Sequence, residues 1–316
     1  MEKKVTLTKA KSNTEEPTAK RKIPKRNSKR FRKLKFFSGL FIAPSFLGVM
    51  TFFLAPFAVI IYYSMVDNPI NAEFVGLVNF KTVATNGAFV TAVKNTAMFS
   101  AIAVPLAVVL SLILAIVLDL KIPFQSQFRT FFLSPMMVPV ASIVLIWQVL
   151  FDYHGMVNKV INVFGGGSID WLKSSYAPIV IVILFLWKNL GYNMILFMAA
   201  LSSIPRDVIE VSMLDGATPW RQFWSIKIRY LLPTILFVGI MSLINSFKVF
   251  REVYLLAGDY PYDSIYTLQH FMNNTFRSLD YQKLSAAAII MFIVITVVVG
   301  ILFFIEERAG RDLEGQ

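Results

Sequence analysis

Two sets of polar side chains interrupt the apolar segments of this chain and could do work beyond anchoring it in a membrane. The first set lies in residues 210–233, where the carboxylates of Glu210 and Asp215 precede Gly216. Carboxylates favour the start of a helix, and a glycine commonly ends one. The pattern predicts a compact amphipathic hairpin that either docks on a partner or only anchors the chain at the membrane surface.

The second set consists of amides, lysines and a tyrosine within two apolar segments. Its members are Lys188, Asn189, Tyr192, Asn193, Asn245 and Lys248. Asn189 and Asn193 are four residues apart, so they share one face of a helix. Sugar hydroxyls bond to amides and sugar C–H faces stack on aromatic rings, so this set is a candidate translocation path. The alternative is that these side chains bond to neighbouring helices and fix the bundle.

Several kinds of catalytic chemistry are excluded by the residues that the chain lacks. It has no cysteine and only two histidines, His154 and His270, both expected in loops, so no metal site is predicted. A nucleotide-binding phosphate loop needs a lysine after its glycines, but residues 165–167, Gly-Gly-Gly, are followed by Ser168 and Ile169. The chain is therefore expected to be non-catalytic, with any ATP chemistry carried by another subunit.

Six apolar segments set the fold class. The chain is 56% hydrophobic and 16% charged, whereas a soluble domain has about 25% charged residues. Each segment is long enough to cross a bilayer as a helix. The segments are 36–65, 93–118, 128–151, 178–201, 231–257 and 284–305. The sequence therefore predicts an all-α membrane protein with a bundle of six transmembrane helices.

Basic residues predict the orientation of the bundle. Residues 1–35 contain 14 Lys or Arg and 3 Glu, while the whole chain has a net charge of +12. Positive residues stay on the cytoplasmic side, so this segment is expected to be a disordered cytoplasmic tail that also meets anionic lipid. No folded nucleic-acid reader accompanies it, so nucleic acid is not an expected partner. Residues 36–306 form the membrane domain, with a cytoplasmic loop at 202–230 and a cytoplasmic C-terminal tail at 307–316.

The loop carries specific signals for a helix, a turn and a second helix. Pro205 suits the first turn of one helix, while Thr218 and Pro219 suit the start of the next. Residues 210–233 resemble the EAA loop of the inner-membrane subunits of binding-protein-dependent ABC importers. Matching positions are Glu210, Ser212, Asp215, Gly216, Ala217, Phe223 and Ile226. Val211 replaces the usual first alanine of this loop, and Arg229 stands where a proline is usual.

Other parts of the chain resemble the sugar-permease branch of the same family. These parts are residues 128–151, 186–205, 246–264 and 284–290, so the resemblance covers roughly 36–306. The branch is the first of two paired permeases, like those of the maltose and glycerol-phosphate importers. The resemblance implies the fold of a type I ABC importer permease in the bacterial plasma membrane, a multi-pass protein with both termini cytoplasmic.

The resemblance also implies partners and a solute. A second homologous permease completes the path, an extracytoplasmic binding protein delivers the solute, and two ATPase subunits hold ATP and Mg, so this chain itself binds no cofactor. The residues implied to couple to an ATPase subunit are Glu210, Ser212, Asp215, Gly216, Ala217, Arg221 and Phe223. A sugar or oligosaccharide is the expected solute. Lys188, Lys248 and Arg251 leave glycerol phosphate or another polar solute open.

Three other classes of membrane protein are weighed against this interpretation. An ATP-independent secondary transporter would need intramembrane carboxylates for ion coupling, and the predicted helices have almost no Asp or Glu away from their ends. A channel would need a re-entrant filter, for which the sequence gives no signal. A membrane-embedded enzyme would need clustered catalytic side chains, which two loop histidines do not supply.

Overall fold

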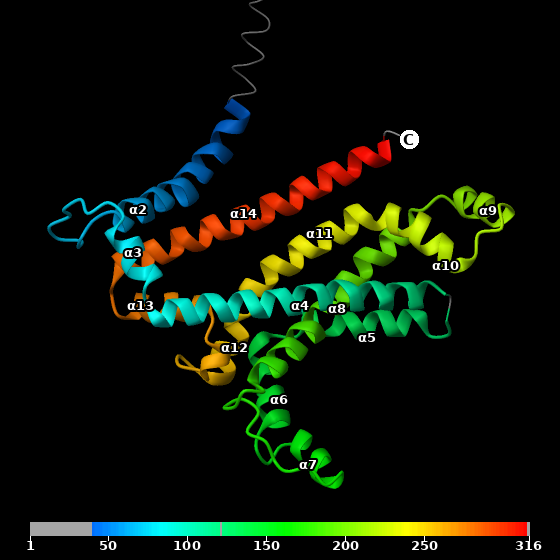
Figure 1. Ribbon diagram of the computed structural model, residues 1–316, viewed down its shortest axis with the longest axis horizontal. Coiled ribbons are helices and arrows are strands. Elements are labelled where there is room, and N and C mark those ends of the chain that lie inside the picture. The colour runs from blue at the N-terminus through cyan, green and yellow to red at the C-terminus, as the bar shows by residue number, and fades with distance from the viewer. Residues whose placement is uncertain (1–39, 121, 315–316) are drawn as a thin grey trace, which may run out of the picture. The chain divides into compact units, whose positions relative to one another are not determined.

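The computed structural model describes residues 40–120 and 122–314, which form helices joined by loops (Figure 1). The predicted basic tail, residues 1–35, lies outside the described residues. The chain divides after Pro56 into two compact units, which are treated separately. In the first unit, helical residues 40–49 are followed by the π-helix η1 (Met50–Leu54).

Six helical spans in the described part of the chain are long and apolar enough to cross a membrane. They are Leu40–Ser64, Gly87–Asp119, Val140–Val163, Ala177–Ser202, Pro219–Ala257 and Tyr281–Ile305. The first of them ends with α2 (Ala55–Ser64), and the short α3 (Val78–Ala84) precedes the second. The prediction of an all-α protein with six membrane helices is confirmed.

The helix α4 (Gly87–Asp119) forms one side of the bundle in the second unit. It begins at Asn86, whose side chain accepts a hydrogen bond from the Phe89 backbone N–H, and it continues through Pro105. Its buried face carries small residues such as Ala103 and Ala107, which have no exposed surface. Small side chains let helices approach closely in a membrane, and α4 packs against α8 (Ala177–Ser202) along this face.

The third apolar segment differs from the prediction of one helix over 128–151. It consists of α5 (Gln125–Met137) and α6 (Val140–Phe151), which are separated by Val138 and Pro139. Val138 is extended, with ψ 133°, because a residue before proline is disfavoured in the helical conformation. Pro135, by contrast, is accommodated inside α5.

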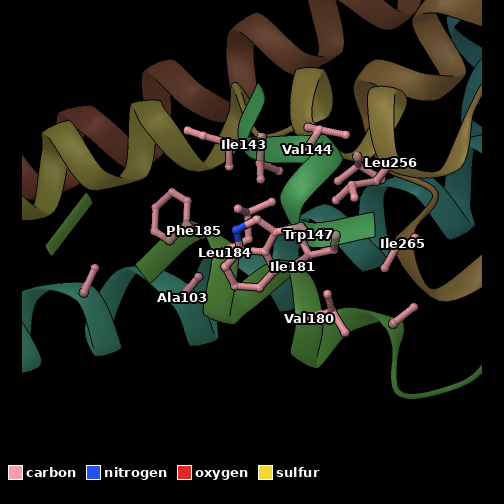
Figure 2. Packing of buried hydrophobic residues seen from close by; sticks show 14 residues of the cluster. Ala103, Ile143, Val144, Trp147, Val180, Ile181, Leu184, Phe185, Leu256 and Ile265 are labelled. Carbon is pink, nitrogen blue, oxygen red and sulfur yellow. The ribbon is translucent and has the colours of Figure 1, made fainter. Parts of the chain in front are cut away.

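The helix α8 lies at the centre of the second unit and packs against α4, α5 and α11 (Ile228–Phe247). A Cβ atom at Gly191 would lie 1.9 Å from the carbonyl oxygen of Phe132 in α5, so this glycine permits the two helices to approach closely. Figure 2 shows Trp147 of α6 packed among Ile181 and Leu184 of α8 in one of the hydrophobic clusters. Trp147 is therefore a core residue.

The fifth segment begins earlier than the predicted start near Leu231. Helix α9 (Arg206–Leu214) is followed by α10 (Pro219–Gln222), the π-helix η2 (Phe223–Lys227) and α11 without a break after Pro219. The Thr218 side chain accepts from the Arg221 N–H and starts this run, and Pro233 lies inside α11. After a two-residue turn, α12 (Phe250–Ala257) completes the segment.

The loops predicted at 152–177 and 258–283 contain helices of their own. The first holds α7 (Met156–Val163), and the second holds η3 (Asp263–Ile265) and α13 (Leu268–Arg277). The expectation that His270 lies in a loop is wrong, since it occupies α13, whereas His154 does lie in a turn. The last helix, α14 (Tyr281–Glu314), extends past the apolar residues and packs against α11 and α13.

Candidate functional site

The first candidate site is the hairpin formed by α9, the turn at Gly216 and α10. Gly216 has φ +74°, a left-handed conformation that glycine adopts without steric cost. The Ala217 N–H donates to the Ser212 carbonyl at 2.9 Å and the Gly216 N–H donates to the Met213 carbonyl at 3.0 Å, which closes the end of α9. The predicted helix, glycine turn and second helix are confirmed. Helix α9 starts at Arg206, with Pro205 extended before it.

The predicted residues of this hairpin divide into exposed and internal ones. The side chains of Glu210, Asp215 and Arg221 are exposed. Ser212 is buried and its hydroxyl donates to the Ile209 carbonyl at 2.7 Å, so it holds the fold of α9. Ala217 and Phe223 are half-buried.

Gln222 is a residue of the hairpin that the sequence reasoning missed. Its side chain is buried, and its Nε2 donates to the Ala217 carbonyl at 3.2 Å. A glutamine four residues after a helix cap carries no distinctive signal, so only the structure identifies this bond between α10 and the turn.

Large apolar side chains are exposed around the same turn. Leu214 is 88% exposed and Trp220 is 72% exposed, and Val211, Met213 and Trp224 are also exposed. An apolar patch of this kind on a hairpin with exposed charges marks an interaction surface. The hairpin thus offers carboxylates and apolar side chains together to a partner or to the membrane surface.

The second candidate site is a cavity of about 400 Å³ between α8 and the α11–α12 segment. Its lining residues are Met136, Leu184, Phe185, Lys188, Asn189, Tyr192, Met241, Asn245, Lys248, Val249, Arg251 and Glu252. Most of the predicted path residues are thus brought together. The exception is Asn193, which is 1% exposed and donates through Nδ2 to the Ser242 hydroxyl at 3.0 Å. Asn193 therefore joins two helices and does not line the cavity.

Amide contacts cross the cavity wall. Asn245 Nδ2 donates to Asn189 Oδ1 at 3.1 Å, and Asn189 Nδ2 donates to the Phe185 carbonyl at 2.8 Å. Asn189 and Asn193 both bond to α11, as their shared helix face predicts. The amides consequently hold α8 against α11 while two of them also border the cavity.

The three cations of the cavity were named together from the sequence, but the ion pair of one of them was not predicted. Lys188 of α8 forms an ion pair with Glu252 of α12, whose side chain is buried. The second carboxylate oxygen of Glu252, Oε2, is buried without a hydrogen bond. Opposite charges in two apolar segments were the available signal, because intramembrane charges tend to pair. Lys248 and Arg251 line the same cavity and are exposed.

His270 is a buried titratable group outside both sites. Its Nδ1 accepts from the Thr267 backbone N–H at 3.3 Å in a capping box, and its Nε2 is buried without a partner. Burial lowers the pKa of His270 to about 4, although the charge of Asp259 opposes this shift. Among residues 40–120 and 122–314, no group of three His, Cys, Asp or Glu side chains is placed to hold a metal ion.

Comparison with known proteins relates both sites to one family. Residues 107–311 match the family described as "Binding-protein-dependent transport system inner membrane component". The chain is 30% identical over 293 residues to the probable starch degradation products transport system permease protein AmyD of Thermoanaerobacterium thermosulfurigenes, covering 90% of this chain and 99% of that protein. It is 26% identical to the sn-glycerol-3-phosphate transport system permease protein UgpA of Agrobacterium fabrum, covering 85% and 94%.

The fold is similar to that of a chain in the crystal structure of a bacterial ABC transporter involved in the import of the acidic polysaccharide alginate. The TM-score is 0.78 at 18% identity, covering 90% of this chain and 99% of the other. The matched family region contains α8, the hairpin and the α11–α12 segment. The chain is therefore a multi-pass membrane protein that belongs to the family of inner-membrane permease components of binding-protein-dependent transport systems.

Proposed function

We propose that this chain forms, together with a second homologous permease, the ATP-driven uptake path for a carbohydrate delivered by an extracytoplasmic binding protein. The family match over residues 107–311 carries this proposal, because it includes both candidate sites. Two relatives, one named for the transport of starch degradation products and one for the transport of lactose, favour a sugar or oligosaccharide. Glycerol phosphate is the second candidate solute, because other relatives are named for its transport and because cations line the cavity.

The cavity between α8 and the α11–α12 segment is the proposed part of the path in this chain. Lys188, Asn189, Tyr192, Asn245 and Lys248 line it, so hydroxyls and charged groups of a solute would meet polar side chains there. We do not include Asn193 in the proposed path, because its side chain bonds to Ser242 and joins α8 to α11. The second permease would form the opposite wall.

The hairpin is the proposed contact with an ATPase subunit. Its exposed carboxylates, Glu210 and Asp215, and its exposed apolar residues Leu214 and Trp220 suit a protein groove. The basic residues of the loop and of segment 1–35 favour a cytoplasmic position for the hairpin and for both termini. ATP and Mg would be held by two ATPase subunits, because this chain has no phosphate loop.

The geometry of the fifth segment supports a mechanical route between the two sites. The helical run from Pro219 to Phe247 starts beside the hairpin turn and carries Asn245 near its other end. A movement of the hairpin on ATP binding would therefore reach the cavity through one continuous helical run. Hydrolysis in the ATPase subunits would reset the path to its inward-facing state.

The test is purification and reconstitution of the complete transporter. We expect the chain to copurify with a second permease and an ATPase, and the complex in proteoliposomes to accumulate solute only with ATP and the binding protein. Active transport by this chain alone, without ATP, would instead identify a secondary transporter.

A further inference from the structure

The cavity between α8 and the α11–α12 segment carries an excess of positive charge. Three cations, Lys188, Lys248 and Arg251, line it together with a single carboxylate, Glu252. The ion pair with Lys188 occupies that carboxylate. Lys248 and Arg251 have no carboxylate partner among the described residues, so two positive charges of the cavity are not balanced within residues 40–120 and 122–314.

The two unpaired cations, Lys248 and Arg251, lie at the break between α11 and α12 in the fifth segment. Lys248 ends α11 and Arg251 lies in the first turn of α12, three residues later. Both side chains are exposed and both line the cavity. Charges within a membrane-spanning segment are costly and mark a path or a partner, so their presence requires a counter-charge or water.

The two amides of the cavity are already engaged. The Asn189 and Asn245 amides bond to each other, and the second donor group of that pair, Asn189 Nδ2, bonds to the Phe185 carbonyl. The donors left for a solute are therefore the Tyr192 hydroxyl, the ammonium of Lys248 and the guanidinium of Arg251. A guanidinium binds a carboxylate or phosphate through two parallel hydrogen bonds, which makes it selective for such groups.

Glu252 does not offer its charge to a solute. Its side chain is buried and paired with Lys188, and its Oε2 is buried as well. A solute that carries both hydroxyls and an anionic group would thus find the Tyr192 hydroxyl and two unpaired cations in one cavity.

We infer that the solute of this transporter is a carbohydrate or polyol bearing an anionic group, a carboxylate or a phosphate, which Lys248 and Arg251 bind during passage. This inference rests on the proposed function and narrows its solute class. The relatives do not decide between a neutral and an anionic solute, because some are named for lactose and others for glycerol phosphate. The charge balance of the cavity decides it in favour of the anion.

The test uses the complete transporter in proteoliposomes with matched pairs of probes. One pair is oligogalacturonate and its neutral methyl ester, and the other is glycerol 3-phosphate and glycerol, so that the two pairs distinguish carboxylate from phosphate. The test variant is Lys248→Gln/Arg251→Gln, the conservative variant is Lys248→Arg/Arg251→Lys, and the control is Lys81→Gln in α3, an exposed lysine outside the cavity.

We expect the wild-type complex to take up the anionic member of one pair. Loss of two charge-assisted contacts should lower that uptake at least about tenfold in the glutamine variant. The conservative variant should recover most of the uptake, and Lys81→Gln should match the wild type.

Four results would overturn the inference. Uptake of the neutral members only, or unchanged uptake by the glutamine variant, would do so while leaving the proposed function intact. Failure of the glutamine variant to copurify with the second permease would assign the two cations to the subunit interface. ATP-dependent uptake of none of the four probes would also overturn the inference, and the proposed function would fail with it only if lactose and maltotriose were not taken up either.

Discussion

The hairpin of α9 and α10 and the cavity between α8 and the α11–α12 segment are both polar regions of an apolar chain, but they are held together over different distances in the sequence. The hairpin closes through bonds between residues a few positions apart, such as Gln222 to Ala217. The cavity depends on pairs such as Asn189 with Asn245, which are 56 positions apart, and Lys188 with Glu252. Bonds between neighbouring residues thus determine the shape of the hairpin, and bonds between residues far apart in the sequence determine the shape of the cavity.

The two regions also differ in what they leave unfinished. The hairpin satisfies its own backbone and exposes Leu214 and Trp220, so its incomplete feature is an apolar surface. The cavity, by contrast, is lined by Lys248 and Arg251, whose charges have no partner among the described residues. Under the proposed function, the hairpin would bind a protein surface, whereas the cavity would bind a polar solute or a partner side chain.

The largest effect is expected from the turn of the hairpin. Gly216 requires a positive φ and has open space around its Cβ position, so Gly216→Val strains only the backbone, by about 1–2 kcal/mol. The turn orients the exposed face of the hairpin, which is the proposed contact with the ATPase subunit. We therefore expect membrane insertion to persist and ATP-coupled uptake to fall at least about a hundredfold. This loss is equivalent to about 2.7 kcal/mol of coupling free energy. Uptake and ATPase activity of the reconstituted complex measure this.

Gly165→Val is the matched control for that change. Gly165 also has a positive φ, +83°, with open space around it, but it lies after α7 and outside the hairpin. An equal loss of uptake in both variants would show that backbone strain in general, and not the hairpin, impairs transport. Glu210→Lys provides a second disruption of the hairpin without any change at the turn.

The next effect, on stability and not on uptake, is expected at the ion pair of the cavity. Lys188→Met leaves the buried Glu252 carboxylate without its partner, which costs about 3–5 kcal/mol and should lower the Tm of the purified protein by about 6–12 °C. The double variant Lys188→Met/Glu252→Met removes both charges and should recover most of this loss. Additive losses in the double variant would mean that the two side chains do not act as a pair.

The smallest effect, on the pH dependence of stability, concerns His270, which makes both a local and a long-range contact. Its capping box with Thr267 is local, and its ring also packs on Phe250 of α12 at 4.7 Å between centroids. The folded-state pKa of about 4 lies below the unfolded value of about 6.5, so stability is complete above pH 6.5 and is lost as the pH falls toward 4. Lowering the pH from 7.5 to 5 should cost about 2 kcal/mol.

Thermal unfolding at several pH values tests this loss in the wild type and two variants. His270→Gln keeps a side chain that can complete the capping box but does not titrate, so it should reduce the dependence on pH. His154→Gln removes an exposed histidine and should leave that dependence unchanged. The same acid loss in all three proteins would assign it to other groups.

The sequence predicts the local region better than the long-range one. Thr218, Pro219 and Gly216 specify the hairpin because caps and left-handed turns depend on adjacent residues. The break at Val138 was missed because Pro135 and Pro139 carry the same local signal, although Pro135 lies inside α5 and Pro139 lies between two helices.

Long-range pairing explains the remaining differences. The cavity residues were singled out by their polarity, but nothing in their spacing distinguishes Asn193, which bonds to Ser242, from Asn189, which borders the cavity. The pairing of Lys188 with Glu252 likewise requires two helices to be placed beside each other. The capping role of His270 was missed because glutamate or glutamine is usual at that position of a capping box.

The most direct test of the central claim is site-specific crosslinking of the hairpin in intact cells. The chain has no cysteine, so Leu214→Cys, at an 88% exposed position of the hairpin, introduces a single reactive thiol, and Val163→Cys in α7, 82% exposed, is its control. We expect Leu214→Cys to crosslink to the ATPase subunit and to resist a membrane-impermeant maleimide added outside, which should label Val163→Cys. External labelling of Leu214→Cys, with no crosslink to an ATPase subunit, would contradict the account.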